Sequence, residues 1–91
     1  MMNIQMNLSS EQNFSEIYRF FLLLGITPNY IGFYQAAYAV ALCMKEPERL
    51  ITITKSLYPD VAKNFQTSAG SVERNIRTVA RISWDSHSKI L

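Results

Sequence analysis

Three prolines, at positions 28, 47 and 59, constrain the fold of this chain most strongly, because each limits where a helix can begin or continue. Proline suits the first turn of a helix, where its missing N–H is not needed, but it breaks a helix interior. Pro28, preceded by the capping residue Thr27, therefore predicts a helix over residues 28–44. Pro47 predicts the start of a third helix, which Pro59 ends.

The segment before Pro28 predicts an earlier helix. Ser9 and Gln12 have the spacing of a capping box, in which each side chain satisfies a free backbone amide of the first turn. Apolar residues then recur at helical intervals as far as Gly25, which supplies a stop signal. We therefore expect a helix over residues 10–24.

The segment after Pro59 predicts a short helix, a turn and a long helix. The short helix covers residues 59–65, and the polar residues 66–68 form a turn whose hydroxyls can cap the next helix. The long helix covers residues 69–84. No stretch shows the sustained alternation of a strand, so we expect an all-α fold, a small bundle of about five helices that contains a helix-turn-helix.

The length of 91 residues allows one core, and a composition of 48% hydrophobic and 18% charged residues is typical of a globular domain. We expect this domain to occupy residues 10–85, between an N-terminal tail (1–9) and a C-terminal tail (86–91). We also expect the chain to be loose from Asp85 to Leu91. The apolar stretches are shorter than the ~20 residues that span a bilayer, so we expect no membrane partner.

The chain offers little for catalysis or metal binding. Cys43 is the single cysteine, which excludes an intramolecular disulfide and fits a reducing cytoplasm. His87 between two serines makes no catalytic triad, which also needs a positioned acid and an oxyanion site. Glu46 and Glu48 are better explained as acids that complement a helix dipole. We therefore expect no enzyme, cofactor or metal site.

The helix predicted over residues 69–84 has two distinct faces. At 100° per residue, the residues on the core side lie within about 50° of one direction. They are Val72, Ile76, Val79, Ala80 and Ser83. Arg74, Arg77, Thr78 and Arg81 fall on the opposite side, within about 60° of Arg74. Three arginines are thus predicted to project from one exposed surface.

A basic stripe of this kind is often an ordinary solvated face. The prediction of a binding surface therefore depends on where the stripe lies in the chain. The net charge is only +2, but from Glu46 onward there are seven basic and five acidic residues. The stripe lies on the second of two helices joined by a tight turn, which is the arrangement that enters the major groove of DNA. We therefore expect double-stranded DNA as the partner.

Side-chain chemistry divides the expected DNA contacts into two sets. Arginine can bond both O6 and N7 of guanine, and a carboxylate can accept a bond from N4 of cytosine. The expected base contacts of these kinds are Glu73, Arg74 and Arg77. Contacts to phosphate position a protein without reading sequence. The expected phosphate contacts are Lys55, Lys63, Thr67, Ser68, Thr78 and Arg81.

Two segments in this order carry a family resemblance: LYPD-V-A-K over residues 57–63 and VER-x-IR over residues 72–77, followed by Trp84. Over residues 10–84 the chain resembles the C-terminal effector domain of the master sporulation response regulator of endospore-forming bacteria. The resemblance implies an all-helical domain that reads a TGNCGAA-type box. It also implies base contacts for Glu73 and Arg74, and a place at the DNA for Arg77.

Three departures from the family shape the expectation. The family has an arginine just before the valine of VER, where this chain has Ser71. The resemblance therefore adds Ser71 to the expected base contacts, but serine cannot make a forked bond to guanine, so we expect an altered or relaxed box preference. The family continues into a further helix after Trp84 that helps to arrange tandem dimers, and its receiver domain has no counterpart before Ser9. We therefore expect weaker cooperativity and no switching by phosphorylation.

The expected function is a standalone transcriptional regulator, or a competitor at operators that a full-length relative uses. The alternative is a protein-interaction module that has lost DNA affinity. The aromatic-rich first half favours that alternative, because it could exceed what one small core can bury. Further partners to test are a second copy of the chain, RNA polymerase and a related regulator.

Overall fold

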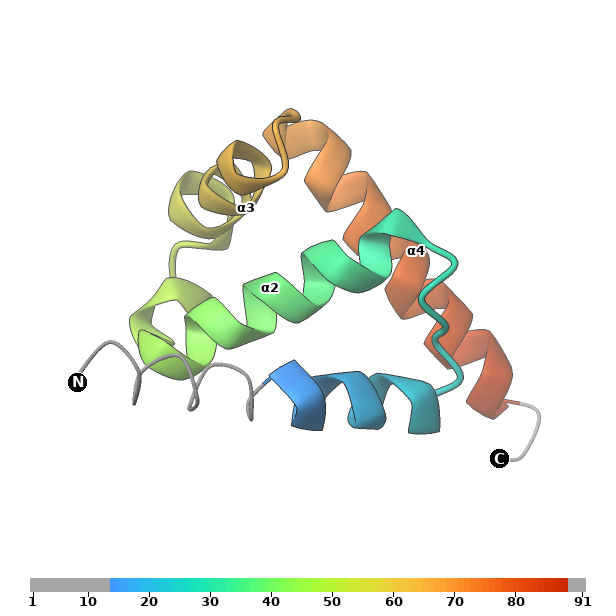
Figure 1. The fold of residues 1–91 in the computed structure, drawn as a ribbon. Helices are drawn as coiled ribbons and strands as arrows, with labels where there is room; N and C mark the ends of the chain where they lie inside the picture. Colours follow the sequence, from blue (N-terminus) through green and yellow to red (C-terminus); the bar gives the residue numbers. More distant parts are fainter. Residues whose placement is uncertain (1–13, 89–91) are drawn as a thin grey trace.

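The structure, a computed structural model, describes residues 14–88 of the chain, with side chains as far as residue 86 (Figure 1). Every regular element in this part is helical, which confirms the predicted all-α class. The order is an N-terminal helix (14–23), α2 (Ile31–Lys45), the 3₁₀ helix η1 (Pro47–Leu50), the π-helix η2 (Ile53–Leu57), α3 (Tyr58–Asn64) and α4 (Ala69–Ser88). The predicted capping box of Ser9 and Gln12 lies outside the described residues.

The N-terminal helix ends at Gly25, as predicted. Gly25 adopts a φ of +83°, and its N–H donates to the carbonyl of Leu22 at 3.0 Å. The N–H of Ile26 donates to the carbonyl of Phe21 at 2.9 Å. This pair of bonds is the Schellman arrangement that closes helices at glycine. Ile26 and Phe21 are both buried in the same core cluster, so the turn also anchors the helix.

Helix α2 begins three residues later than predicted. Pro28 lies in a turn, and Tyr30 is the N-cap, with extended backbone and no side-chain hydrogen bond. The helix lies across the middle of the molecule, between the N-terminal helix and α3 (Figure 1). Its small residues Ala36, Ala37 and Ala39 are buried, and their size lets neighbouring helices approach.

The third helix expected after Pro47 does not form as one unit. The chain makes the short 3₁₀ helix η1, leaves helical geometry at Thr52 (φ −121°, ψ 48°) and resumes as η2. The cause is the β-branched run over residues 51–54, since such side chains lose rotamer freedom in a helix. Ile51 is left 85% exposed.

Helix α3 matches its prediction to within one residue at each end. Pro59 occupies its first turn, where no N–H is needed. The backbone stays helical from Leu57 into Tyr58, so Pro59 marks the change from π to α hydrogen bonding and not a gap between helices. Val61 and Ala62 face the core.

Arg49 holds η1 against α3. Its Nε donates to Oε1 of Glu46 at 2.7 Å, and its Nη1 donates to Oδ2 of Asp60. The hydrogen bond to Asp60, and then that to Glu46, raise the pKa of the Arg49 guanidinium above its ordinary value. Both acidic partners therefore favour the charged form of Arg49.

Two groups of buried residues form the core on either side of α2. One joins the N-terminal helix, α2 and α4 around Phe33, and the other joins α2, α3 and α4 around Val61 and Val72. Ile76 packs against both, so α4 connects them. In the described part of the chain, no helix has the length and hydropathy that a membrane crossing needs.

Candidate nucleic-acid interface

Helix α4 has one buried and one exposed face. Val72 and Val79 are buried among α2 and α3, as predicted. Arg74, Arg77 and Arg81 are exposed, and we call the surface they form the arginine face. The periodicity of the sequence thus predicted correctly that these three arginines stand clear of the core.

The predicted core face of α4 is wrong at one residue, Ala80. It was expected to face the core, but it is exposed. At the opposite edge of the buried face of α4, Asn75 is half-buried, and its Nδ2 donates to Oε1 of Gln35 at 3.0 Å. Helix α2 therefore meets α4 on the Asn75 side, which turns Ala80 toward solvent.

Helix α4 also extends further than predicted. It continues to Ser88, so the expectation of loose chain from Asp85 is wrong as far as that residue. Ser86 explains part of the extension, because a Cβ built at Gly25 would lie only 2.8 Å from its Oγ. The end of α4 therefore packs against the turn that closes the N-terminal helix, as Figure 1 also shows.

The turn over residues 65–68 determines how α4 begins. Gln66 adopts a φ of 55°, and the N–H of Thr67 donates to the carbonyl of Ala62 at 3.0 Å. Oγ of Ser68 then accepts a hydrogen bond from the N–H of Ser71 at 3.1 Å. The turn predicted from its polar residues therefore caps α4 through Ser68.

The residues predicted to contact bases lie together on the first turns of α4. Arg74 is exposed, and within residues 14–88 its guanidinium makes no ion pair. Nη2 of Arg77 donates to Oε2 of Glu73 at 2.6 Å, one helical turn apart. Ser71 is half-buried beside them. The four side chains thus occupy one continuous stretch of helix surface.

The residues predicted to contact phosphates are exposed but more scattered. Thr67 and Ser68 lie at the start of α4, and Lys63 lies in the last turn of α3. Lys55 lies apart on η2, which packs mainly against α3. The hydroxyl of Thr78 donates to the carbonyl of Arg74 at 3.0 Å, so this bond must break before Thr78 can donate to a phosphate.

Sequence reasoning missed the buried contact that orients this surface. Gln35 is only 2% exposed, and its amide bonds Asn75 across the crossing of α2 and α4. Its position was the available signal, because it is a polar residue inside an otherwise apolar stretch of α2. Buried amides need partners, so a hydrogen bond to another element could have been expected.

The fold and this surface define the class of the protein, an all-helical domain that presents one long cationic helix after a short helix and a tight turn. The family model described as sporulation initiation factor Spo0A C terminal matches residues 17–90, so the chain belongs to this family. The family comprises DNA-binding domains of sporulation regulators, which is a regulatory and not an enzymatic role. The resemblance stated from the sequence is confirmed.

Proposed function

We propose that the chain is a transcriptional regulator that binds double-stranded DNA sequence-specifically, with α3, the turn over 65–68 and α4 acting as a helix-turn-helix. Helix α4 would lie in the major groove, which is wide enough to admit it. The observation that carries the proposal is the arginine face of α4, set opposite the buried residues Val72 and Val79.

The base contacts follow from the side chains on the first turns of α4. Arg74 is exposed and without an ion-pair partner in the described chain, so its guanidinium is available to bond O6 and N7 of a guanine. Glu73 would accept from N4 of a cytosine, and Ser71 would add one hydroxyl contact. Together with the family resemblance, this chemistry supports a TGNCGAA-like box.

The ion pair between Glu73 and Arg77 is compatible with a role for both residues at the DNA. Their side chains are 40% and 65% exposed, so the pair is solvated and costs little to rearrange. Before binding, the pair restrains two long side chains on one side of the helix. On the box, Arg77 would move to a base edge or phosphate while Glu73 remains as the acceptor.

The phosphate contacts would come from both sides of the turn. Ser68 uses its oxygen to cap α4, which leaves its hydroxyl proton free to donate to a phosphate. Lys63 on α3 and Arg81 on α4 would add positive charge before and after the turn, and the exposed Thr67 within the turn would add a hydroxyl donor. Lys55 on η2 would make an outer contact, and Thr78 would contribute only after releasing the Arg74 carbonyl.

The test is DNA binding by fluorescence anisotropy, on a duplex with the box and on a scrambled duplex, over a range of salt concentrations. Arg74→Ala should cost about 1–3 kcal/mol on the box and less on the scrambled duplex. Arg19→Ala removes the same charge from the exposed surface of the N-terminal helix and should change little. Equal binding of the box by Arg74→Ala and the parent chain would reject the assignment.

The phosphate contacts have their own test on the same duplexes. Lys63→Ala should weaken binding to both sequences alike. It should also reduce the slope of log affinity against log salt by about 0.9, because one fewer phosphate is neutralised.

A second candidate function, a protein-interaction module, is supported by exposed apolar side chains away from α4. Phe20, Val40, Met44 and Leu50 are all more than a third exposed. They line two adjacent hollows, one between the N-terminal helix and α2 and the other between α2 and the segment formed by η1 and η2. A second copy of the chain or RNA polymerase could cover such a surface. Salt-independent, negligible DNA binding together with self-association lost in Phe20→Ser would favour this function.

A further inference from the structure

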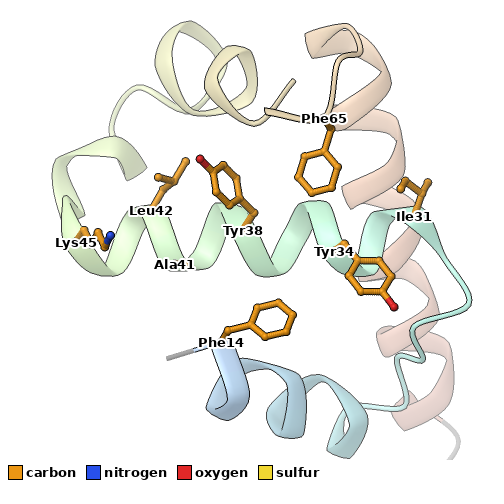
Figure 2. Close-up of a pocket in the computed structure, with 8 residues that line it drawn as sticks. All are labelled: Phe14, Ile31, Tyr34, Tyr38, Ala41, Leu42, Lys45 and Phe65. Atoms are coloured by element: carbon orange, nitrogen blue, oxygen red, sulfur yellow. The ribbon is translucent and has the colours of Figure 1, made fainter. Parts of the chain in front are cut away.

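An apolar groove of about 460 Å³ lies along the face of α2 that is turned away from α4 (Figure 2). Its walls come from three elements: α2 itself, the N-terminal helix and the end of α3. The lining residues are Phe14, Ile31, Tyr34, Tyr38, Ala41, Leu42, Lys45 and Phe65. None of them belongs to α4, so the groove is separate from the arginine face.

The groove is elongated because its α2 residues follow one helical stripe. They recur three or four positions apart from Ile31 to Lys45, except for the adjacent pair Ala41 and Leu42, and the stripe corresponds to a length of about 21 Å at 1.5 Å per residue. Phe14 and Phe65 flank the stripe on opposite sides (Figure 2). The ring of Phe65 packs edge-on against Tyr38, with centroids 6.0 Å apart, which shapes one wall.

This surface leaves apolar side chains in contact with water. Phe14 is 41% exposed and Ile31 is 56% exposed, although both line a concave surface. Small-molecule sites are typically concave, of about 300–1,000 Å³, and mostly apolar with a few polar groups. The groove has this character, and its volume lies within the range of small-molecule sites.

The charge of the groove is confined to one end, at Lys45. Within residues 14–88, Lys45 makes no ion pair, and the neighbouring acid Glu46 is bonded to Arg49. The nearby C-terminus of α2 carries partial negative charge from its carbonyls, so only the lysine itself can attract an anion there. The hydroxyls of Tyr34 and Tyr38 make no hydrogen bond within the same residues and provide further polar atoms.

We propose that this groove binds an aliphatic carboxylate, with the hydrocarbon chain along α2 and the carboxylate at Lys45. The elongated apolar floor suits an extended chain. The one cation at its end, which has no ion-pair partner among the described residues, suits a single anionic head. Phe65 is the C-cap of α3, so the bound chain would lie next to the turn that leads into α4. The proposal does not depend on DNA binding.

The experiment uses the full chain and three probes that share a ten-carbon tail: decanoate, decanol and decyltrimethylammonium, each below the concentration at which it forms micelles. Calorimetry should show saturable one-to-one binding that is tightest for decanoate. Lys45→Met should weaken decanoate about tenfold and leave decanol unchanged. Lys55→Met, an exposed lysine on η2 outside the groove, should change neither.

Two further measurements locate the site. Aromatic proton signals of Tyr34, Tyr38 and Phe65 should shift on addition of decanoate. Ala41→Leu, which adds bulk to the groove floor, should weaken decanoate and decanol alike. The proposal is overturned by a lack of saturable binding, by equal affinity for the anionic and cationic probes, or by an unchanged decanoate affinity in Lys45→Met. It is also overturned if decanoate shifts the proton signals of residues outside the groove. If the groove signals shift when only the protein concentration is raised, a second copy of the chain occupies the groove and the proposal is likewise overturned.

Discussion

Gly32 of α2 lies directly against the backbone carbonyl of Asn75 in α4, with no room for a side chain between them. A Cβ at position 32 would overlap that oxygen and lie 2.7 Å from Cγ2 of Val79. The two helices therefore cross backbone to backbone at this point. The crossing places the buried face of α4 against α2 and leaves the arginine face outside.

Gly32→Ala should destabilise the chain, because neither the backbone oxygen nor the packed valine can move without cost. The free energy of unfolding should fall by about 1–3 kcal/mol, measured by urea denaturation followed by circular dichroism. Gly70→Ala is the matched control, since a Cβ there meets no atom within 4 Å and alanine favours a helix. That variant should gain up to about 1 kcal/mol, and a loss equal to that of Gly32→Ala would contradict the close approach.

The hydrogen bond between Gln35 and Asn75 should show strong coupling. Asn75→Ala leaves the buried amide oxygen of Gln35 without a donor, which should cost about 1–3 kcal/mol of unfolding free energy. The double variant Gln35→Leu/Asn75→Leu removes both polar groups, so it should cost less than Gln35→Leu and Asn75→Leu added together. Strictly additive values in this double-mutant cycle would show that the bond contributes nothing.

Gln66 is in the left-handed region, which side chains with a Cβ seldom occupy. Gln66→Gly should therefore raise the free energy of unfolding by about 0.5–1 kcal/mol, because glycine enters this region without strain. Thermal denaturation would measure the change. Gln66→Ala retains the Cβ and should show no gain, so equal stabilisation by both replacements would speak against strain at this position.

Ser68 should contribute to stability as the cap of α4. Ser68→Ala removes the oxygen that accepts from the N–H of Ser71, and should cost about 1 kcal/mol. Chemical denaturation would show the loss. The adjacent Thr67→Ala is the control, because no hydrogen bond of the Thr67 hydroxyl is seen within residues 14–88. Similar losses in the two variants would argue against a specific cap.

Ser71→Arg should strengthen DNA binding if α4 lies in the major groove. It restores the arginine found in the resembled family, and its fork can bond a guanine edge as well as add charge. Affinity for the box should rise, and the salt slope should steepen by about 0.9 if the new charge also reaches a phosphate. Ser71→Lys should add charge without the fork, so it should raise affinity for box and scrambled duplex alike. A Ser71→Arg variant that binds no better than the parent would place position 71 away from the DNA.

Local signals in the sequence were sufficient for most helix limits. Gly25, Pro59 and Ser68 act through their own backbone or side chain, and the structure uses each of them close to the predicted place. Pro28 failed as a helix start because Tyr30 provides the extended cap instead. The single helix predicted after Pro47 was wrong because the β-branched run over residues 51–54 outweighs the proline signal.

The candidate nucleic-acid interface was predicted only in part, because local sequence signals determine only part of it. The periodicity of α4 placed Arg74, Arg77 and Arg81 outward, since their direction depends only on the helix itself. The inward placement of Ala80 was wrong because it lies at the edge of the apolar arc. Which edge is covered depends on where α2 crosses, and no pattern within α4 contains that information.

The sequence by itself determined the all-helical class, the turn before α4 and the arginine face, because each follows from interactions between residues a few positions apart. Only the tertiary structure decided that Gly32 meets Asn75, that Gln35 is buried against the same residue and that Phe14 and Phe65 flank one groove. These contacts join residues tens of positions apart. They depend on the angle and register at which whole helices pack, which short-range patterns do not specify.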